Sequence, residues 1–285
     1  MINQKWEDHE LAKYLAVCKD AAHAAGNVLK DFIGRIHVRE KGRADLVTEA
    51  DVAAQEKVKE VVSRAFPDHV FLGEEDTPCS DSERAREGVF RWIVDPLDGT
   101  TNYVHGVPFF GVSLALECGG ELLVSAIYAP LLGEFFSAAK GHGAFLNENP
   151  LSVSRTREVQ QSVIAVGFPP VIRYDAPGLL AFLNCLCECQ AVRRTGSTAL
   201  NMAYVAAGRF DACWNFSTKP WDMAAGALLV QEAGGTLTTI TGDDFFIDQN
   251  TFLVAATPEL HKDFRELIHS QQFIHWMEEN GSRLR

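Results

Sequence analysis

The most informative stretch of this sequence is a short apolar run that ends at two carboxylates. Trp92, Ile93 and Val94 have the character of a buried strand, and the strand is predicted to stop at Asp95 because Pro96 has no N–H for a ladder. Asp98 is then predicted to cap a helix opening at residues 99–101, whose N–H groups have no partner inside the helix. Carboxylates bind hard cations such as Mg²⁺, and helix N-termini bind phosphate. The pattern therefore favours metal-assisted phosphoryl chemistry, the alternative being a Pro/Asp/Gly turn in which Asp98 is only a cap.

Three further acids stand at predicted strand ends or helix starts. Thr48 and Asp51 are spaced like a capping box, and Asp222 precedes an apolar helix. Glu74 lies in a run of three acids after the short strand-like residues 70–72. Each has a local alternative, which is helix capping for Asp51 and Asp222 and a solvated acidic loop for Glu74. Only the set of acids, taken together, indicates a shared site.

Periodicity predicts mixed α and β structure in two halves. Apolar residues at steps of four and three predict a helix of about six turns over residues 11–32, and residues 110–138 read as an antiparallel meander. Residues 1–150 are expected to form an α+β half with an antiparallel sheet and most of the metal ligands. Residues 151–285 are expected to form an α/β half that supplies Asp222 and substrate contacts. The site should lie between the halves.

Charge and cysteine content narrow the possible partners. The net charge of -12 disfavours nucleic acid and anionic membranes as partners, and the polar N-terminus lacks an apolar signal core, so a cytoplasmic protein is expected. An acidic phosphatase needs bound cations to reverse the field at its site. Cys185, Cys187 and Cys189 form a C-x-C-x-C run, for which packing thiols are favoured over a soft-metal site because no second ligand pair follows.

Three blocks of sequence match one known family in order and spacing. Gly-Glu-Glu at residues 73–75, Trp-Ile-Val-Asp-Pro-Leu-Asp-Gly-Thr-Thr-Asn at 92–102 and Trp-Asp-Met-Ala-Ala-Gly at 221–226 resemble the inositol monophosphatase family of Mg²⁺-dependent, lithium-sensitive phosphatases. The resemblance runs from Asp45 to about Thr257. It implies the layered αβαβα sandwich of the inositol monophosphatase and fructose-1,6-bisphosphatase type, two or three Mg²⁺ ions and a homodimer.

The resemblance also implies a role for individual residues. Glu74, Asp95 and the Leu97 carbonyl would hold a first Mg²⁺, and Asp95, Asp98 and Asp222 a second. Asp51 and Thr100 would orient and activate the attacking water, with no covalent intermediate. Gly99 and Thr100 would offer backbone N–H groups to the phosphate.

Substrate identity is less constrained than the reaction. Inositol 1-phosphate is the expected substrate, but Asn215 stands where inositol-specific members carry a Glu that contacts inositol hydroxyls. Arg194 and Lys219 could face the substrate or could be solvated surface charges. Fructose 1,6-bisphosphate, histidinol phosphate, NADP and adenosine 3′,5′-bisphosphate are alternative substrates. A non-catalytic metal-binding protein of the same fold also stays open. An aspartyl-phosphate mechanism is disfavoured because Asp95 and Asp98 are three residues apart, not two.

Overall fold

The computed structural model describes residues 6–35, 38–42, 45–76, 88–169 and 171–280 of the 285-residue chain. The helices are α1 (Asp8–Phe32), α2 (Glu49–Ala65), α3 (Thr100–Val104), α4 (Pro177–Glu188), α5 (Thr198–Ala206), α6 (Pro220–Glu232), α7 (Pro258–Ile268) and α8 (Gln272–Asn280). The strands are β1 (Val38–Gly42), β2 (Asp45–Thr48), β3 (Val70–Gly73), β4 (Phe90–Asp98), β5 (Gly111–Cys118), β6 (Glu121–Ala129), β7 (Glu134–Ala139), β8 (Ala144–Leu146), β9 (Asn149–Pro150), β10 (Val163–Gly167), β11 (Ala191–Arg193), β12 (Ala212–Asn215), β13 (Thr236–Thr238) and β14 (Phe252–Ala255).

The first helix has the length that its apolar period predicts. Leu11, Cys18, Ala22 and Leu29 are buried along one face of α1, which packs on α2, β5 and β6. The small residues on this face allow a close approach to the sheet. A Cβ at Gly26 would lie 2.3 Å from the Tyr128 ring on β6, so a larger side chain would force the helix away.

Two sheets carry the core. The larger has the order β3-β4-β5-β6-β7-β8-β9, in which β3 runs parallel to β4 and every other pair is antiparallel. The meander predicted for residues 110–138 is therefore confirmed. The smaller sheet has the order β11-β10-β12-β14-β13, with β10 parallel to both neighbours and β14 antiparallel to both of its own. A separate two-stranded ribbon, β1-β2, was not expected from the sequence.

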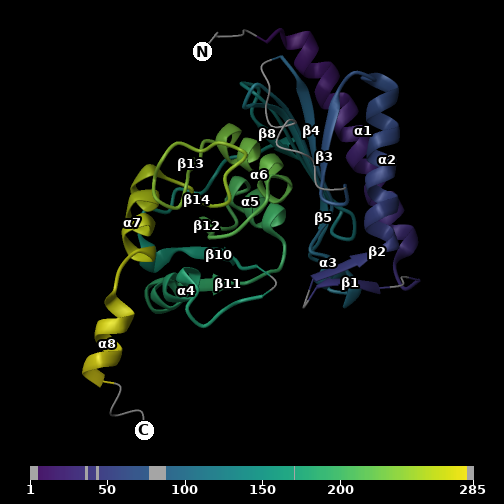
Figure 1. Ribbon diagram of the computed structural model, residues 1–285. Coiled ribbons are helices and arrows are strands. Elements are labelled where there is room, and N and C mark those ends of the chain that lie inside the picture. The colour runs from purple at the N-terminus through teal and green to yellow at the C-terminus, as the bar shows by residue number, and fades with distance from the viewer. Residues whose placement is uncertain (1–5, 36–37, 43–44, 77–87, 170, 281–285) are drawn as a thin grey trace.

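Helices and sheets alternate in five layers (Figure 1). Helices α1 and α2 cover one face of the large sheet, and α5 and α6 lie between the two sheets. Helices α4 and α7 pack together on the outer side of the small sheet. This arrangement confirms the predicted αβαβα sandwich. All strands of the large sheet lie within residues 70–150, and all strands of the small sheet within residues 163–255.

Two predicted boundaries were wrong. Strand β4 does not stop at Asp95 but continues to Asp98, which pairs with Gly111, and the register shifts between the two acids. The irregularity accommodates Pro96, which cannot donate to the ladder. Helix α6 begins at Pro220 rather than after Asp222, because proline is favoured in the first helical turn, where its missing N–H costs nothing.

Candidate active site

Asp95 lies at the centre of a group of buried or partly buried acids. It is 2% exposed near the end of β4, and its Oδ1 accepts a hydrogen bond from the Leu97 N–H at 3.0 Å. Burial raises its pKa well above the ordinary range, and the charges of Glu74, Asp98 and Asp222 raise it further. Glu74, Asp98 and Asp222 thus act electrostatically on Asp95, and these four are the carboxylates that the sequence singled out as ligands. Like charges in a buried place need a cation to be stable in ionised form.

Asp98 does not cap the helix that follows it, as the sequence had predicted. The N-cap of α3 is Gly99, whose φ of 94° turns the chain and leaves no side chain to cap. The Asp98 carboxylate instead accepts from Ser197 Oγ at 2.6 Å, from the Ala199 N–H at 2.6 Å and from the Thr198 N–H at 3.3 Å. These donors form the start of α5. Burial raises the pKa of Asp98 to about 6, although these hydrogen bonds act to lower it.

Asp222 enters the site from the first turn of α6. It is the third helical residue rather than the N-cap, and its Oδ2 accepts the N–H of the true N-cap, Lys219, at 2.8 Å. Burial raises the pKa of Asp222 to about 7, and the charge of Asp98 adds to the effect. Because α6 lies between the sheets, Asp222 reaches the acids of the large sheet from the second half of the chain.

Asp51 and Thr100 are neighbours, as expected of a pair that orients water. Thr100 Oγ1 lies 3.3 Å from Asp51 Oδ1 and 3.1 Å from the Leu97 carbonyl oxygen. Asp51 is 1% exposed and forms the predicted capping box at the start of α2, where its Oδ2 accepts from Thr48 N at 2.8 Å. Burial raises the pKa of Asp51, and the charge of Glu75 contributes. Asp51 thus caps a helix with one oxygen and faces Thr100 with the other.

Glu74 follows the last residue of β3 and is partly buried. Its N–H donates to the Val94 carbonyl oxygen at 3.1 Å, which continues the parallel pairing of β3 with β4 up to the residue before Asp95. The backbone of Glu74 is therefore held by strand pairing rather than by a free loop. The register of two parallel strands places Glu74 beside the central carboxylate.

The residues predicted to bind phosphate and substrate differ in their burial, unlike the acids, which are all buried or partly buried. Gly99 is tightly packed, and a Cβ there would lie 3.1 Å from the Phe109 carbonyl oxygen in addition to meeting an unfavourable φ. Asn215 ends β12, is 3% exposed and accepts the Ser217 N–H at 3.0 Å, so its amide oxygen already has a local partner. Lys219 and Arg194 are exposed, and the Arg194 guanidinium stands 5.7 Å from the centre of the Phe168 ring.

The donor set suits a hard cation, although the carboxylates are turned toward protein partners. Within the described ranges, no three His, Cys, Asp or Glu side chains stand close enough together to hold a metal ion as they lie. One oxygen of each of Asp95, Asp98 and Asp222 instead accepts a hydrogen bond from a backbone N–H group. All candidate ligands are oxygens, which is the chemistry that Mg²⁺ prefers. Their mutual repulsion is what a divalent cation would relieve.

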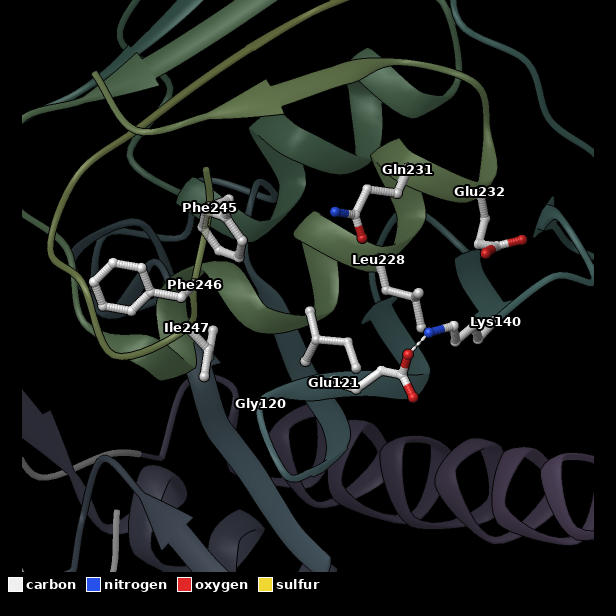
Figure 2. Close-up of a pocket in the computed structure, with 10 residues that line it drawn as sticks. Gly120, Glu121, Lys140, Leu228, Gln231, Glu232, Phe245, Phe246 and Ile247 are labelled. Atoms are coloured by element: carbon white, nitrogen blue, oxygen red, sulfur yellow. Dashed lines mark ion pairs between the residues drawn. The ribbon is translucent and has the colours of Figure 1, made fainter. Parts of the chain in front are cut away.

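A cavity of about 220 Å³ lies away from these acids (Figure 2). It is formed by the turn between β5 and β6, the end of α6 and residues 245–247. Its charged groups are paired, since Lys140 contacts Glu121, and Glu232 accepts the N–H groups of Gly141 and Gly143 at 2.8 Å each. None of the predicted site residues lines it, so we place the chemistry at the carboxylates.

Cys185 is buried and Cys189 partly buried at the end of α4, as packing thiols would be, whereas Cys187 is exposed and does not fit that interpretation. No helix in the part of the chain that the structure describes is long and apolar enough to cross a membrane.

Sequence reasoning missed the groups that hold the acids in place. Ser197 is the N-cap of α5, and the acid that its hydroxyl contacts lies 99 residues earlier in the chain. Asn102, at the end of the central motif, donates to the carbonyl oxygens of Phe109 at 2.7 Å and Thr195 at 2.8 Å. It thereby ties α3 to the loop before α5. The polar residue types were visible in the sequence, whereas their distant partners were not.

Several known proteins are similar to this chain in sequence and in fold. The inositol-1-monophosphatase of Rhizobium meliloti (strain 1021) is 39% identical over 258 residues, which cover 89% of this chain and 95% of that protein. The fructose-1,6-bisphosphatase/inositol-1-monophosphatase of Aquifex aeolicus (strain VF5) is 38% identical over 256 residues, 88% of this chain and 93% of that protein.

Solved structures agree with the relatives. The extragenic suppressor protein suhB from Bartonella henselae matches with a TM-score of 0.82 and 38% identity over 90% of this chain and 98% of that one. An IMPase/NADP phosphatase complexed with Mg²⁺ and phosphate shares the fold, with a TM-score of 0.80 and 24% identity over 92% of this chain and 97% of that one. The model of the inositol monophosphatase family matches residues 10–273. The chain therefore belongs to the inositol monophosphatase family and is a phosphatase.

Proposed function

We propose that this phosphatase hydrolyses inositol 1-phosphate with Mg²⁺, using an activated water and no covalent intermediate. The observation that carries the proposal is the contact of Thr100 Oγ1 with Asp51 Oδ1, at 3.3 Å, beside the buried carboxylates around Asp95. A hydroxyl held between a buried carboxylate and the Leu97 carbonyl oxygen is fixed in direction. Such a group can orient a water molecule for attack on a phosphorus atom.

The residues divide into those that hold cations and those that handle the water. Glu74, Asp95, Asp98, Asp222 and the Leu97 carbonyl oxygen would hold two or three Mg²⁺ ions, which when bound neutralise the ester and lower the pKa of a coordinated water. Thr100 would orient the attacking water. A proton of that water would pass to the Asp51 carboxylate. The raised pKa of Asp51 suits this role, because a carboxylate that is reluctant to stay charged accepts a proton more readily.

Substrate contacts follow from the position of the phosphate. We assign the backbone N–H groups of Gly99 and Thr100 to phosphate oxygens, since both stand where β4 ends at the acids. Asn215 would contact the sugar or polyol hydroxyls through its amide group. Lys219 and Arg194 are exposed charges available to a second anionic group on a larger substrate.

The proposal also covers the domain division, oligomeric state, location and lithium sensitivity of the protein. The division into residues 1–150 and 151–285 and a cytoplasmic location are inferred from the sequence, and a homodimer and inhibition by lithium from the family. The division is supported by the separation of the two sheets at residue 150. Light scattering measures the oligomer, and activity assayed with added LiCl measures the inhibition.

A panel of phosphate esters tests the substrate. Phosphate release with Mg²⁺ would be measured for inositol 1-phosphate, fructose 1,6-bisphosphate, histidinol phosphate, NADP and adenosine 3′,5′-bisphosphate. We expect inositol 1-phosphate to lead by at least tenfold in kcat/KM, about 1.4 kcal/mol of transition-state discrimination. The Aquifex relative is named for two substrates, so a lead for fructose 1,6-bisphosphate is the main competing outcome. No release from any ester would favour a non-catalytic protein of this fold.

A further inference from the structure

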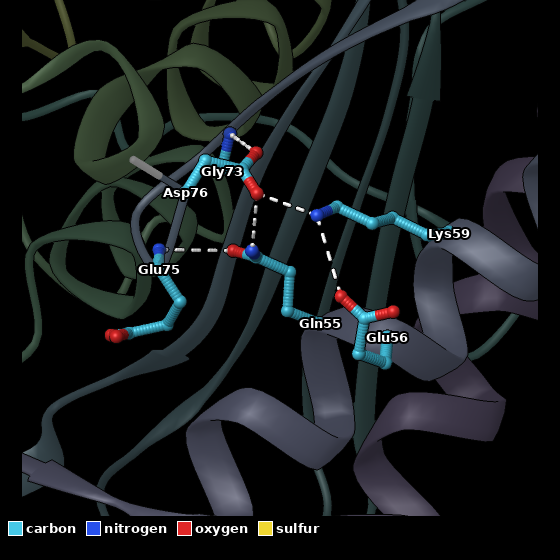
Figure 3. Close-up of polar contacts among 6 residues, drawn as sticks. All are labelled: Gln55, Glu56, Lys59, Gly73, Glu75 and Asp76. Carbon is cyan, nitrogen blue, oxygen red and sulfur yellow. Dashed lines mark hydrogen bonds and ion pairs between the residues drawn. The ribbon is translucent and has the colours of Figure 1, made fainter. Parts of the chain in front are cut away.

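The turn after β3 is fastened to helix α2 by side chains that the reaction does not use (Figure 3). Asp76 Oδ2 accepts the Gly73 N–H at 3.0 Å, which closes the turn on itself. Gln55 reaches the turn from α2, donating from Nε2 to Asp76 Oδ1 at 3.0 Å and accepting the Glu75 N–H on Oε1 at 3.1 Å. Lys59, one helical turn later, contacts the same Asp76 oxygen at 2.5 Å.

These contacts hold the Gln55 side chain in one orientation. Gln55 is 2% exposed, and both ends of its amide group are used, so its orientation is fixed by a donor on one side and an acceptor on the other. The fit is close, because a Cβ at Gly73 would lie 2.3 Å from Gln55 Oε1. A larger residue at position 73 would therefore have to displace the Gln55 amide from the position in which it contacts the turn.

We refer to Gln55, Lys59 and Asp76 as the clamp, and the residue that they enclose is Glu74. Its neighbours on both sides, Gly73 and Glu75, are held through their backbone N–H groups by Asp76 and Gln55. Its own N–H is bonded to the Val94 carbonyl oxygen. Three consecutive backbone N–H groups are thus fixed, and with them the backbone that carries the Glu74 side chain, whose charge acts on Asp95.

We propose that Gln55 and Asp76 are positioning residues that set the metal affinity of the site by orienting Glu74. The inference rests on the proposed function, since it takes Glu74 as a metal ligand. Groups that orient a ligand without touching the metal are typically worth about 10–100-fold in metal affinity or activity. A carboxylate on an unfastened turn would have to be ordered at the moment of binding, which weakens binding without altering the bound state.

Two variants test this. Gln55→Leu removes both hydrogen bonds while keeping a buried side chain of similar size, and Gln55→Glu keeps the acceptor for Glu75 but places a second carboxylate against Asp76. Binding would be measured directly by Mn²⁺ titration followed by electron paramagnetic resonance, alongside the Mg²⁺ dependence of phosphate release. We expect both variants to need at least tenfold more metal for half-saturation, while kcat at saturating metal stays within about threefold of wild type.

The control variant lies on the same helix. Glu60→Gln removes an exposed ion-pair partner of Lys57 and Arg64, and it should change neither metal affinity nor kcat. Gln55→Leu combined with Asp76→Asn completes a double-mutant cycle. Because the two residues act through one hydrogen bond and one turn, the double variant should bind metal little worse than either single variant.

The outcomes separate positioning from stability and from the proposed function. A lower Tm with unchanged Mn²⁺ affinity would reduce Gln55 to a structural role and overturn the inference. A large fall in kcat at saturating metal, with unchanged affinity, would also overturn it. If wild-type protein releases phosphate from no ester yet Gln55→Leu weakens Mn²⁺ binding, the proposed function fails and the clamp stands.

Discussion

Changing Asp95 to Asn should stabilise the metal-free protein while abolishing its response to Mg²⁺. Asp95 is buried among Glu74, Asp98 and Asp222, whose charges all disfavour its ionised form. The asparagine side chain keeps an oxygen that can accept the Leu97 N–H and removes the charge. The variant therefore loses repulsion in the absence of metal and loses a ligand in its presence.

The structure sets the size of both effects. One like-charge contact in surroundings of this kind costs on the order of 1–3 kcal/mol. At about 2.1 cal/mol/K per residue, 285 residues have an unfolding entropy of about 0.6 kcal/mol/K, so the variant should melt about 2–5 °C higher than wild type in EDTA. Metal at a hundred times its Kd stabilises wild type by about 2.7 kcal/mol, or about 4–5 °C, and this gain should vanish in the variant.

The pH dependence of the first effect has a definite sign. A carboxyl whose pKa is raised by folding favours the protonated state in the native protein, so metal-free wild type loses stability as pH rises from about 4 through the native pKa. The advantage of Asp95→Asn should therefore grow with rising pH, which a comparison at pH 6 and pH 9 would show.

Differential scanning calorimetry with EDTA and with Mg²⁺, at both pH values, measures these shifts. The exposed change Asp263→Asn on α7 is the matched control and should leave both melting and the Mg²⁺ response unchanged. A destabilised Asp95→Asn protein that still gains stability from Mg²⁺, or that turns over normally, would refute the assignment of Asp95.

Three further changes address catalysis, the core and acid stability. Thr100→Ala should lower kcat by about 10²–10⁴-fold with Mg²⁺ affinity within twofold of wild type, as measured by steady-state kinetics and Mn²⁺ titration, and a smaller fall would remove Thr100 from the reaction. Arg91→Met leaves the fully buried Glu117 without its 2.9 Å partner and should cost about 3–5 kcal/mol in urea unfolding, most of which a second change of Glu117→Leu should restore. His69, stacked between two phenylalanines, has its pKa lowered to about 4 by burial, and its neutral ring accepts the Trp92 Nε1–H at 3.0 Å. Its contribution to stability should be complete above pH 6.5 and should fall by about 1–2 kcal/mol, after allowance for solvent screening, as pH drops from 6.5 to 4. Unfolding curves of His69→Phe should lack this part of the slope.

Local patterns predicted those parts of the fold that depend on neighbouring residues. The stripe from Leu11 to Leu29 gave α1, and the spacing of Thr48 and Asp51 gave the start of α2. The meander followed from alternating apolar runs and turn residues. The β1-β2 ribbon was missed because it is short and the residues near 42 have turn character.

The site was predictable in its residue types but not in its contacts. Resemblance identified Asp51, Thr100 and the four carboxylates together, and in the structure Thr100 contacts Asp51 while the charges of Glu74, Asp98 and Asp222 act on Asp95. The local interpretation of Asp98 as a cap for the next helix was wrong, because its partners come from the start of α5. A local sequence pattern gives information about residues only a few positions apart. The contact of Asp98 with α5 depends instead on how the two sheets pack.

The contact between Asp98 and the start of α5 also has a consequence for how the protein folds. It joins groups 99 to 101 residues apart, one at the end of β4 in the large sheet and the others at the start of α5, which lies between the sheets. Contacts of such sequence separation form slowly, because loop closure must precede them. We expect a refolding chain to recover helix and sheet before it recovers affinity for metal. Newly made, half-folded molecules would then present separated acids that hold Mg²⁺ weakly, and the ability to cleave an ester would appear only with the last docking step.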